Sequence, residues 1–123
     1  ENGGDIFIKT DSERKIGIYA GDSPLSGKLA LKILPKQTPA GVCTSSGTVG
    51  HSLSFGKADA VVIVSKDTFL ADAVATSVGN KVKTPKDIEY ALNYASQIKG
   101  ITGAVIIVRD KIGAWGDIEL TKF

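Results

Sequence analysis

The fold is decided by the stretch ADAVVIVSKDTFLADAVATSVGNKVKTPKDIEYALNYASQIKGITGAVIIV, residues 58–108. It opens with an apolar run of strand length, residues 58–64, and closes with another, residues 104–108. The second run is too apolar for a solvated sheet face, so it predicts a central strand. The stretch therefore predicts two buried strands that enclose a helical region.

Two helices are expected between these strands. The first begins after Asp67 as N-cap, covers residues 68–78 and stops at Gly79-Asn80 in a left-handed turn. The second has Thr84 as N-cap and Pro85 at its first helical position, shows apolar residues at helical spacing and ends at Gly100.

In the flanking sequence apolar and polar residues alternate, as they do in half-buried strands. Alternation predicts strands around Ile6 and Ile8, over residues 16–19 and over residues 28–34. After a turn at residues 109–111, a return strand is expected from Ile112, broken by residues 113–116, with alternation resuming at Ile118 and Leu120. Strands, two helices and strands in that order predict an α+β fold, a mostly antiparallel sheet with two consecutive helices packed on one face.

Composition excludes several classes of protein. The chain has 123 residues, a formal net charge of +2 spread along its length, and a single cysteine, Cys43. The weak charge argues against a nucleic-acid partner, and one cysteine cannot form an internal disulfide. No apolar run approaches the ~20 residues that span a bilayer, so we expect a cytoplasmic protein without a membrane partner.

An acidic residue in the middle of the first predicted helix is the sharpest chemical signal. Asp72 and Thr76 are four residues apart, so their side chains share one stripe of the helix. A carboxylate and a hydroxyl facing a cleft suit a Mg²⁺ ion that keeps waters and binds a phosphate. The alternative of equal weight is structural, with Asp72 bonded to backbone amides or to a lysine and Thr76 in a turn of helix.

A segment rich in hydroxyl residues and glycine, residues 43–51, is the second candidate. Glycines let backbone amides approach a ligand, and hydroxyls donate to phosphate oxygens. Cys43 and His51 could act as a thiol nucleophile and its base, although a lone cysteine is more often a small buried hydrophobe. His51, the one histidine, is a general acid/base candidate, and a histidine in a surface loop is the alternative.

The glycine turn Asn2-Gly3-Gly4-Asp5 precedes the first predicted strand. Paired glycines permit positive φ and a close approach of the backbone to a ligand, while a plain turn is the default interpretation. Aromatic residues that could stack on a flavin are scattered, and such residues usually belong to the core. They are Phe7, Tyr19, Phe55 and Trp115.

In this order the three segments resemble the C-terminal half of the ApbE-like superfamily, the FAD:protein FMN transferases. The matching motifs are Asn2-Gly3-Gly4-Asp5, Thr44-Ser45-Ser46-Gly47 leading to His51, and Ala71-Asp72-Ala73-Val74-Ala75-Thr76. The longer run of residues 42–60 resembles an uncharacterised archaeal and bacterial branch of that superfamily.

The resemblance implies a cofactor site. It implies that Asp72 and Thr76 are Mg²⁺ ligands and that FAD or a related nucleotide is the ligand, while the catalytic candidate, His51, follows from its own chemistry as the one histidine. The implied cofactor-binding residues are Asn2, Gly3, Gly4, Asp5, Thr44, Ser45, Ser46, Gly47 and Thr48. In the transferases an FMN moiety is moved from FAD to a threonine of a target protein.

One departure leaves two functions open. The transferases usually continue the histidine with two apolar residues and Asp-Pro, whereas Ser52-Leu53-Ser54-Phe55 follows His51 here. The first hypothesis is an enzyme-type site that binds a flavin or another pyrophosphate nucleotide with Mg²⁺, with FMN transfer from FAD to a protein acceptor as its finer form. The alternative is a nucleotide-binding module without transfer chemistry. A scaffold within a complex is a third possibility. We expect residues 1–123 to be the C-terminal part of a single longer domain, completed by the missing N-terminal half or by a second copy.

Overall fold

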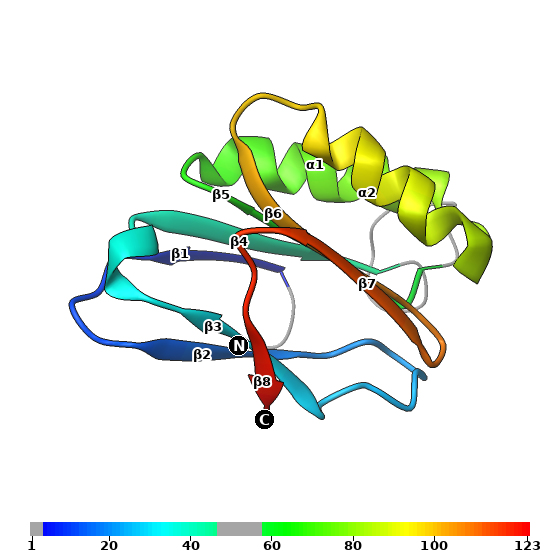
Figure 1. Ribbon diagram of the computed structural model, residues 1–123, viewed down its shortest axis with the longest axis horizontal. Helices are drawn as coiled ribbons and strands as arrows, with labels where there is room; N and C mark the ends of the chain where they lie inside the picture. The colour runs from blue at the N-terminus through cyan, green and yellow to red at the C-terminus, as the bar shows by residue number, and fades with distance from the viewer. Residues whose placement is uncertain (1–3, 47–57) are drawn as a thin grey trace.

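The computed structural model describes residues 4–46 and 58–123 and has three layers. Two helices cover one face of a five-stranded sheet, and a three-stranded sheet covers the other face (Figure 1). One apolar core lies between the helices and the larger sheet, and a second lies between the two sheets. The predicted α+β class, with two consecutive helices on one sheet face, is confirmed.

The five-stranded sheet has the order β1-β4-β5-β6-β7, and each neighbouring pair is antiparallel. Val61 and Ile63 on β5 face the helices, while Val62 and Val64 face the smaller sheet. Burial on both faces explains why this strand is an uninterrupted apolar run. The strands are β1 (Gly4–Ile8), β4 (Ala40–Ser45), β5 (Ala60–Ser65), β6 (Ile101–Val108) and β7 (Lys111–Gly116).

The remaining strands form a separate sheet, which the sequence did not predict. It comprises β2 (Arg14–Ile18), β3 (Leu29–Ile33) and β8 (Leu120–Lys122), in the order β2-β3-β8. Leu31 and Ile33 pack against the inner face of the larger sheet. Alternation shows that a strand has one buried face, but it does not show which sheet the strand joins, so a single sheet was expected.

The first helix, α1 (Thr68–Lys81), begins where it was predicted and ends later. The Asp67 carboxylate caps it by accepting hydrogen bonds from the amides of Phe69, at 3.0 Å, and Leu70, at 3.2 Å. The expected stop at Gly79-Asn80 is wrong, because both residues lie inside the helix. Gly79 is buried there, so packing outweighs the low helix propensity of glycine.

Two further boundaries are corrected. A 3₁₀ turn at Pro85–Asp87 precedes the second helix, α2 (Ile88–Ser96), so Pro85 is not its first α-helical residue and Gly100 does not end it. Residues 113–116 do not break a strand but belong to β7. A Cβ at Gly113 would lie 2.6 Å from Ile88 Cγ2, so this glycine allows α2 to pack closely on β7.

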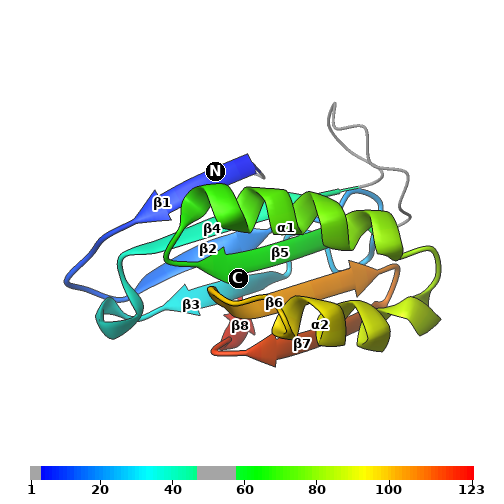
Figure 2. The same ribbon diagram turned by 90° about the horizontal axis from the view of Figure 1, so that it is seen from above.

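The helix α1 runs in the same direction as β4 and lies beside the edge strand β1 (Figure 2). This arrangement puts the exposed side of α1 next to the β1 edge of the sheet. Within residues 4–46 and 58–123, no helix is both long enough and apolar enough to cross a membrane.

Candidate functional site

Asp72 and Thr76 lie on the exposed side of α1, one helical turn apart. The opposite side of this helix, which includes Ala71, Val74 and Val78, packs into the core. No hydrogen bond or ion pair joins the Asp72 carboxylate to another residue of the described chain. The structural alternative, in which a lysine or backbone amides satisfy Asp72, therefore has no support within the described residues.

Two neighbouring strands bring Asp5 and Cys43 together. Asp5 on β1 pairs with Cys43 on β4, so their side chains leave the sheet on the same face. Cys43 is fully buried in the core beneath the helices, and its Sγ lies 3.4 Å from the carbonyl oxygen of Thr68 at the start of α1. This pair lies where β1, β4 and α1 meet.

The charges of Asp5 and Asp72 both act on the buried Cys43 thiol. Burial, a hydrogen bond with Asp5 and the negative charges of Asp5 and Asp72 together raise the pKa of the Cys43 thiol to about 12, and burial is the largest of these causes. A thiol with this pKa stays protonated near neutral pH, which removes Cys43 as a nucleophile. The expectation that Cys43 is a small buried hydrophobe is confirmed.

The predicted hydroxyl residues Thr44, Ser45 and Ser46 lie at the end of β4. Ser45 is two residues beyond Cys43 and pairs with Val61, so it shares the helix-side face of the sheet. Its hydroxyl is buried and has no hydrogen-bond partner among the described residues. An unpaired buried hydroxyl is costly and is available to a ligand that approaches from this end of β4.

The structure describes only some of the other predicted site residues. Gly4 begins β1 with a φ of 83°, which agrees with the expectation that this turn needs glycine. Asn2, Gly3, Gly47, Thr48 and His51 lie outside the described residues, so their predicted roles stay predictions.

The donor set suits a hard cation better than a soft one. Asp5, Asp72 and Thr76 offer carboxylate and hydroxyl oxygens, and Mg²⁺ in proteins is held by one or two carboxylates together with substrate phosphates and waters. Over residues 4–46 and 58–123, no group of three or more His, Cys, Asp or Glu side chains is placed to hold a metal by itself. The residues therefore fit a metal that arrives with a phosphate ligand, not a closed all-protein metal cage.

A buried carboxylate that the sequence analysis missed has a structural role. Asp59 is fully buried, accepts a hydrogen bond from the Arg109 amide at 2.7 Å, and lies 3.7 Å from the Arg109 guanidinium. Arg109 has a φ of 56° in the turn between β6 and β7, so Asp59 holds this strained turn. The sequence signal for this role is the presence of an acidic residue inside the apolar run of residues 58–64.

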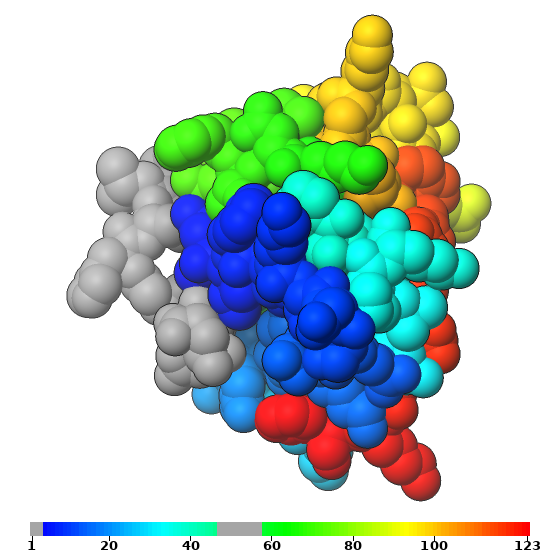
Figure 3. Space-filling model, turned by 90° about the vertical axis from the view of Figure 1, so that its left-hand side faces the viewer, coloured from blue at the N-terminus to red at the C-terminus, as the bar shows by residue number. Residues whose placement is uncertain are grey.

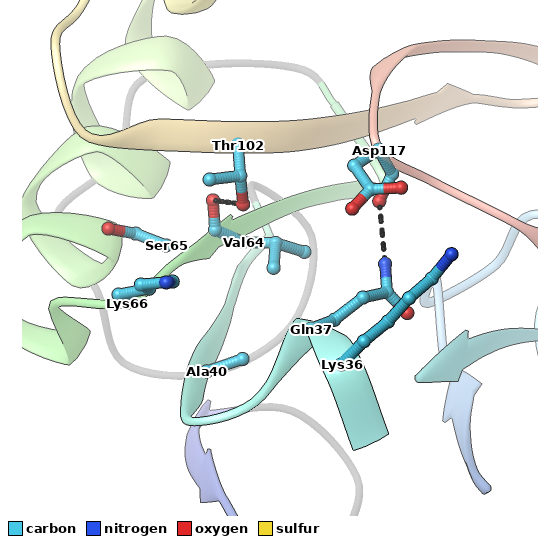
Figure 4. A pocket seen from close by; sticks show the side chains of 8 residues that line it. All are labelled: Lys36, Gln37, Ala40, Val64, Ser65, Lys66, Thr102 and Asp117. Carbon is cyan, nitrogen blue, oxygen red and sulfur yellow. Dashed lines mark hydrogen bonds between the residues drawn. The ribbon is translucent and has the colours of Figure 1, made fainter. Parts of the chain in front are cut away.

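Two cavities lie elsewhere. The first, of about 110 Å³, is at the opposite end of β4 and β5 from Ser45 (Figure 4). Its polar groups are mostly paired, since Gln37 Nε2 donates to the carbonyl oxygen of Asp117 at 3.3 Å and Thr102 Oγ1 donates to that of Val64 at 3.1 Å. The residues that line it are Lys36, Gln37, Ala40, Val64, Ser65, Lys66, Thr102 and Asp117.

The second cavity is an open groove of about 540 Å³ between α2 and the free edge of β7. Ile88, Leu92 and Ile112 give it an apolar lining, with Lys86 and Lys111 as its basic residues. None of the described residues predicted for the functional site lines either cavity. Figure 3 shows the face on which β1 and α1 lie side by side, and Asp5 and Asp72 belong to these two elements.

The chain is an α+β protein in which the candidate residues Asp5 and Asp72 belong to an edge strand and to the helix beside it, and the boundary between β1 and α1 is called the seam below. The chain belongs to the family described as AbpE bacteria, whose model matches residues 1–120. Membership of this family is consistent with the resemblance to the ApbE-like superfamily.

The curated relatives that the chain resembles are described as UPF0280 proteins. The chain is 47% identical over 116 residues to a UPF0280 protein of Methanocella arvoryzae, covering 94% of this chain and 47% of the relative. It is 50% identical over 118 residues to a UPF0280 protein of Methanospirillum hungatei, covering 96% of this chain and 47% of the relative. The chain thus spans about half the length of the curated relatives it matches.

Proposed function

We propose that the seam between β1 and α1 binds a nucleotide diphosphate, such as FAD, together with Mg²⁺. The observation that carries this proposal is the convergence of Asp5 and Asp72, whose charges both act on Cys43 from different elements. Carboxylate oxygens are ligands that Mg²⁺ prefers, and Asp5 and Asp72 present two carboxylates from different elements. A divalent cation that is bound to a phosphate would bind both carboxylates.

Each residue would have a distinct part in binding. Asp72 and Thr76 would hold the metal, with Asp5 as a second carboxylate at its side, and a bound Mg²⁺ would supply neutralisation of the phosphate charge. The buried Ser45 hydroxyl would donate a hydrogen bond to a phosphate oxygen, which would satisfy its own unpaired group.

The finer proposal is transfer of FMN from FAD to a threonine of a protein acceptor. The buried, protonated Cys43 thiol takes no part as a nucleophile in this proposal. Proton transfer would fall to His51, which lies outside the described residues. The support for this activity is the resemblance in the three motifs, together with membership of the AbpE bacteria family.

A binding module without transfer chemistry is the second candidate. Ser52-Leu53-Ser54-Phe55 replaces the acidic segment that usually follows the histidine in the transferases. This change would leave the carboxylates of Asp5 and Asp72 in place and remove an acid close to the proposed base. Such a protein would bind the nucleotide without moving any part of it.

Because β1 is an edge strand of the described five-stranded sheet, we propose that a second polypeptide completes the site beside it. The candidates are the N-terminal half of a longer single domain, of which residues 1–123 would be the C-terminal part, and a second copy of this chain. Size-exclusion chromatography with light scattering tests the second copy. A mass of twice 12.8 kDa supports a dimer, whereas a monomer that binds FAD fully contradicts the need for any partner.

Calorimetric titration of FAD in the presence and absence of Mg²⁺ tests the binding proposal. We expect Mg²⁺-dependent binding, and we expect Asp72→Ala to abolish the Mg²⁺ dependence. Asp110→Ala, in the exposed β6–β7 turn, is the matched control because it removes the same charge at a distance from the site. Binding by Asp72→Ala that equals the wild type in Mg²⁺ would contradict the metal assignment.

Intact-mass measurement separates the two candidate activities. The protein is incubated with FAD, Mg²⁺ and a threonine-containing acceptor peptide. An acceptor mass increased by one FMN moiety supports transfer and eliminates the module. An unchanged acceptor mass, with FAD binding intact, supports the module.

A further inference from the structure

Phe7 is a large apolar side chain that lies in solvent beside the proposed site. Its exposed fraction is 62%, although scattered aromatic residues were expected to lie in the core. Phe7 is two residues after Asp5 on β1, and residues two apart on a strand share one face. The ring of Phe7 and the carboxylate of Asp5 therefore leave the sheet on the same, helix-side face.

The strand register places Phe7 beside the first turn of α1. Phe7 pairs with Gly41, and a Cβ at Gly41 would lie 2.6 Å from Thr68 Cα, so α1 rests directly on β4 at this point. The next pair on this face is Asp5 with Cys43, whose thiol experiences the charge of Asp72. An aromatic ring and a carboxylate thus follow one another along the seam, with their Cα atoms about 6.6 Å apart.

We propose that Phe7 stacks on a planar aromatic ring of the nucleotide whose diphosphate binds beside Asp5 and Asp72. This inference rests on the proposed function and adds the residue that would select a nucleotide over a free diphosphate. The face of an exposed phenylalanine accepts any planar base, and stacking removes both apolar surfaces from water. Isoalloxazine and adenine share this chemistry, and both are present in FAD.

Phe69 provides a matched control on the same molecule. It is 89% exposed and lies in the first turn of α1. At 100° per residue it lies nearly opposite to the buried Ala71 and Val78, so its ring points away from the sheet. Phe7 and Phe69 are therefore both exposed phenylalanines, and Phe7 is the one on the seam.

The test compares Phe7→Ala, Phe69→Ala and Phe7→Trp in titrations with FAD and with inorganic pyrophosphate, each in Mg²⁺. We expect Phe7→Ala to raise the Kd for FAD roughly 5- to 100-fold and to leave the Kd for pyrophosphate unchanged. Phe69→Ala should change neither constant. Phe7→Trp should restore FAD affinity and quench flavin fluorescence on binding. Separate titrations with FMN and ADP identify which ring is stacked, and a loss with either supports the proposal.

Three results would overturn the inference. Wild-type FAD affinity in Phe7→Ala removes the stacking role and leaves the proposed function standing. Equal weakening of FAD and pyrophosphate by Phe7→Ala shows a general structural effect and not stacking. A wild-type chain that binds neither ligand in Mg²⁺, both alone and together with the N-terminal half proposed to complete the domain, contradicts the proposed function itself, and the inference with it.

Discussion

At the scale of single residues, Cys43 shows how position decides chemistry. A cysteine followed by hydroxyl residues and a histidine is a pattern that could have held a nucleophile. The alternation of β4 turns its side chain into the core beneath α1, where burial and two carboxylates keep the thiol protonated. Cys43 is therefore a core residue that links Asp5 to Asp72.

Labelling with a thiol reagent tests this assignment. At pH 8 a thiol with a pKa of about 12 carries roughly a thousandfold less thiolate than one at the ordinary value of 9.0. We expect DTNB to leave the native protein unlabelled and to label it stoichiometrically in denaturant. Rapid labelling of the native chain would contradict the assignment.

The same pKa predicts a dependence of stability on alkaline pH. The native pKa is raised, so the contribution of the protonated thiol to folding is complete below pH 9 and is lost as the pH rises toward 12. Unfolding free energies of the wild type and of Cys43→Ala should converge over this interval. A constant difference between the two proteins would show that the thiol does not titrate there.

At the scale of elements, α1 is the part that positions Asp72 and Thr76, and its start is fixed by a cap. Asp67→Ala removes the acceptor of the Phe69 and Leu70 amides, so we expect the unfolding free energy to fall by about 1 kcal/mol. Urea denaturation followed by circular dichroism measures this change. Asp67→Ser, which keeps a capping oxygen, should retain most of the stability, and equal losses in both variants would exclude capping as the cause.

The sequence predicted starts of elements better than their ends. Asp67 was identified because a cap acts locally, through its own side chain and amides two and three residues away. Glycine alone favours turns, so the sequence predicts stops at Gly79 and Gly113, yet tertiary packing places both inside elements. Spacing along α1 predicted the stripe of Asp72 and Thr76, whereas the convergence with Asp5 depends on strand register, which a single sequence does not specify.

At the scale of the whole molecule, β5 joins two cores. Its residues alternate between the layer under the helices and the layer over the small sheet, so loss of packing in one core should destabilise the other. The single tryptophan, Trp115, packs against the helix-side core, and Leu31 lies in the core on the far side of the sheet.

Leu31→Ala tests this coupling. We expect it to lower the unfolding free energy by roughly 2–5 kcal/mol, as large-to-small substitutions in cores do. Unfolding followed by Trp115 fluorescence should shift to the same lower midpoint as the circular dichroism transition. An unshifted Trp115 transition would show that the two layers unfold independently.

The proposed divalent cation at the β1–α1 seam depends on the carboxylate of Asp72. Binding of Mn²⁺, as a paramagnetic substitute for Mg²⁺, is measured by electron paramagnetic resonance with pyrophosphate present, for the wild type, Asp72→Ala and Asp110→Ala. The account predicts stoichiometric Mn²⁺ binding by the wild type and by Asp110→Ala, and loss of at least tenfold in affinity in Asp72→Ala, roughly the energy of one charge-assisted contact. Equal Mn²⁺ affinity in all three proteins, or no binding by the wild type, would contradict it.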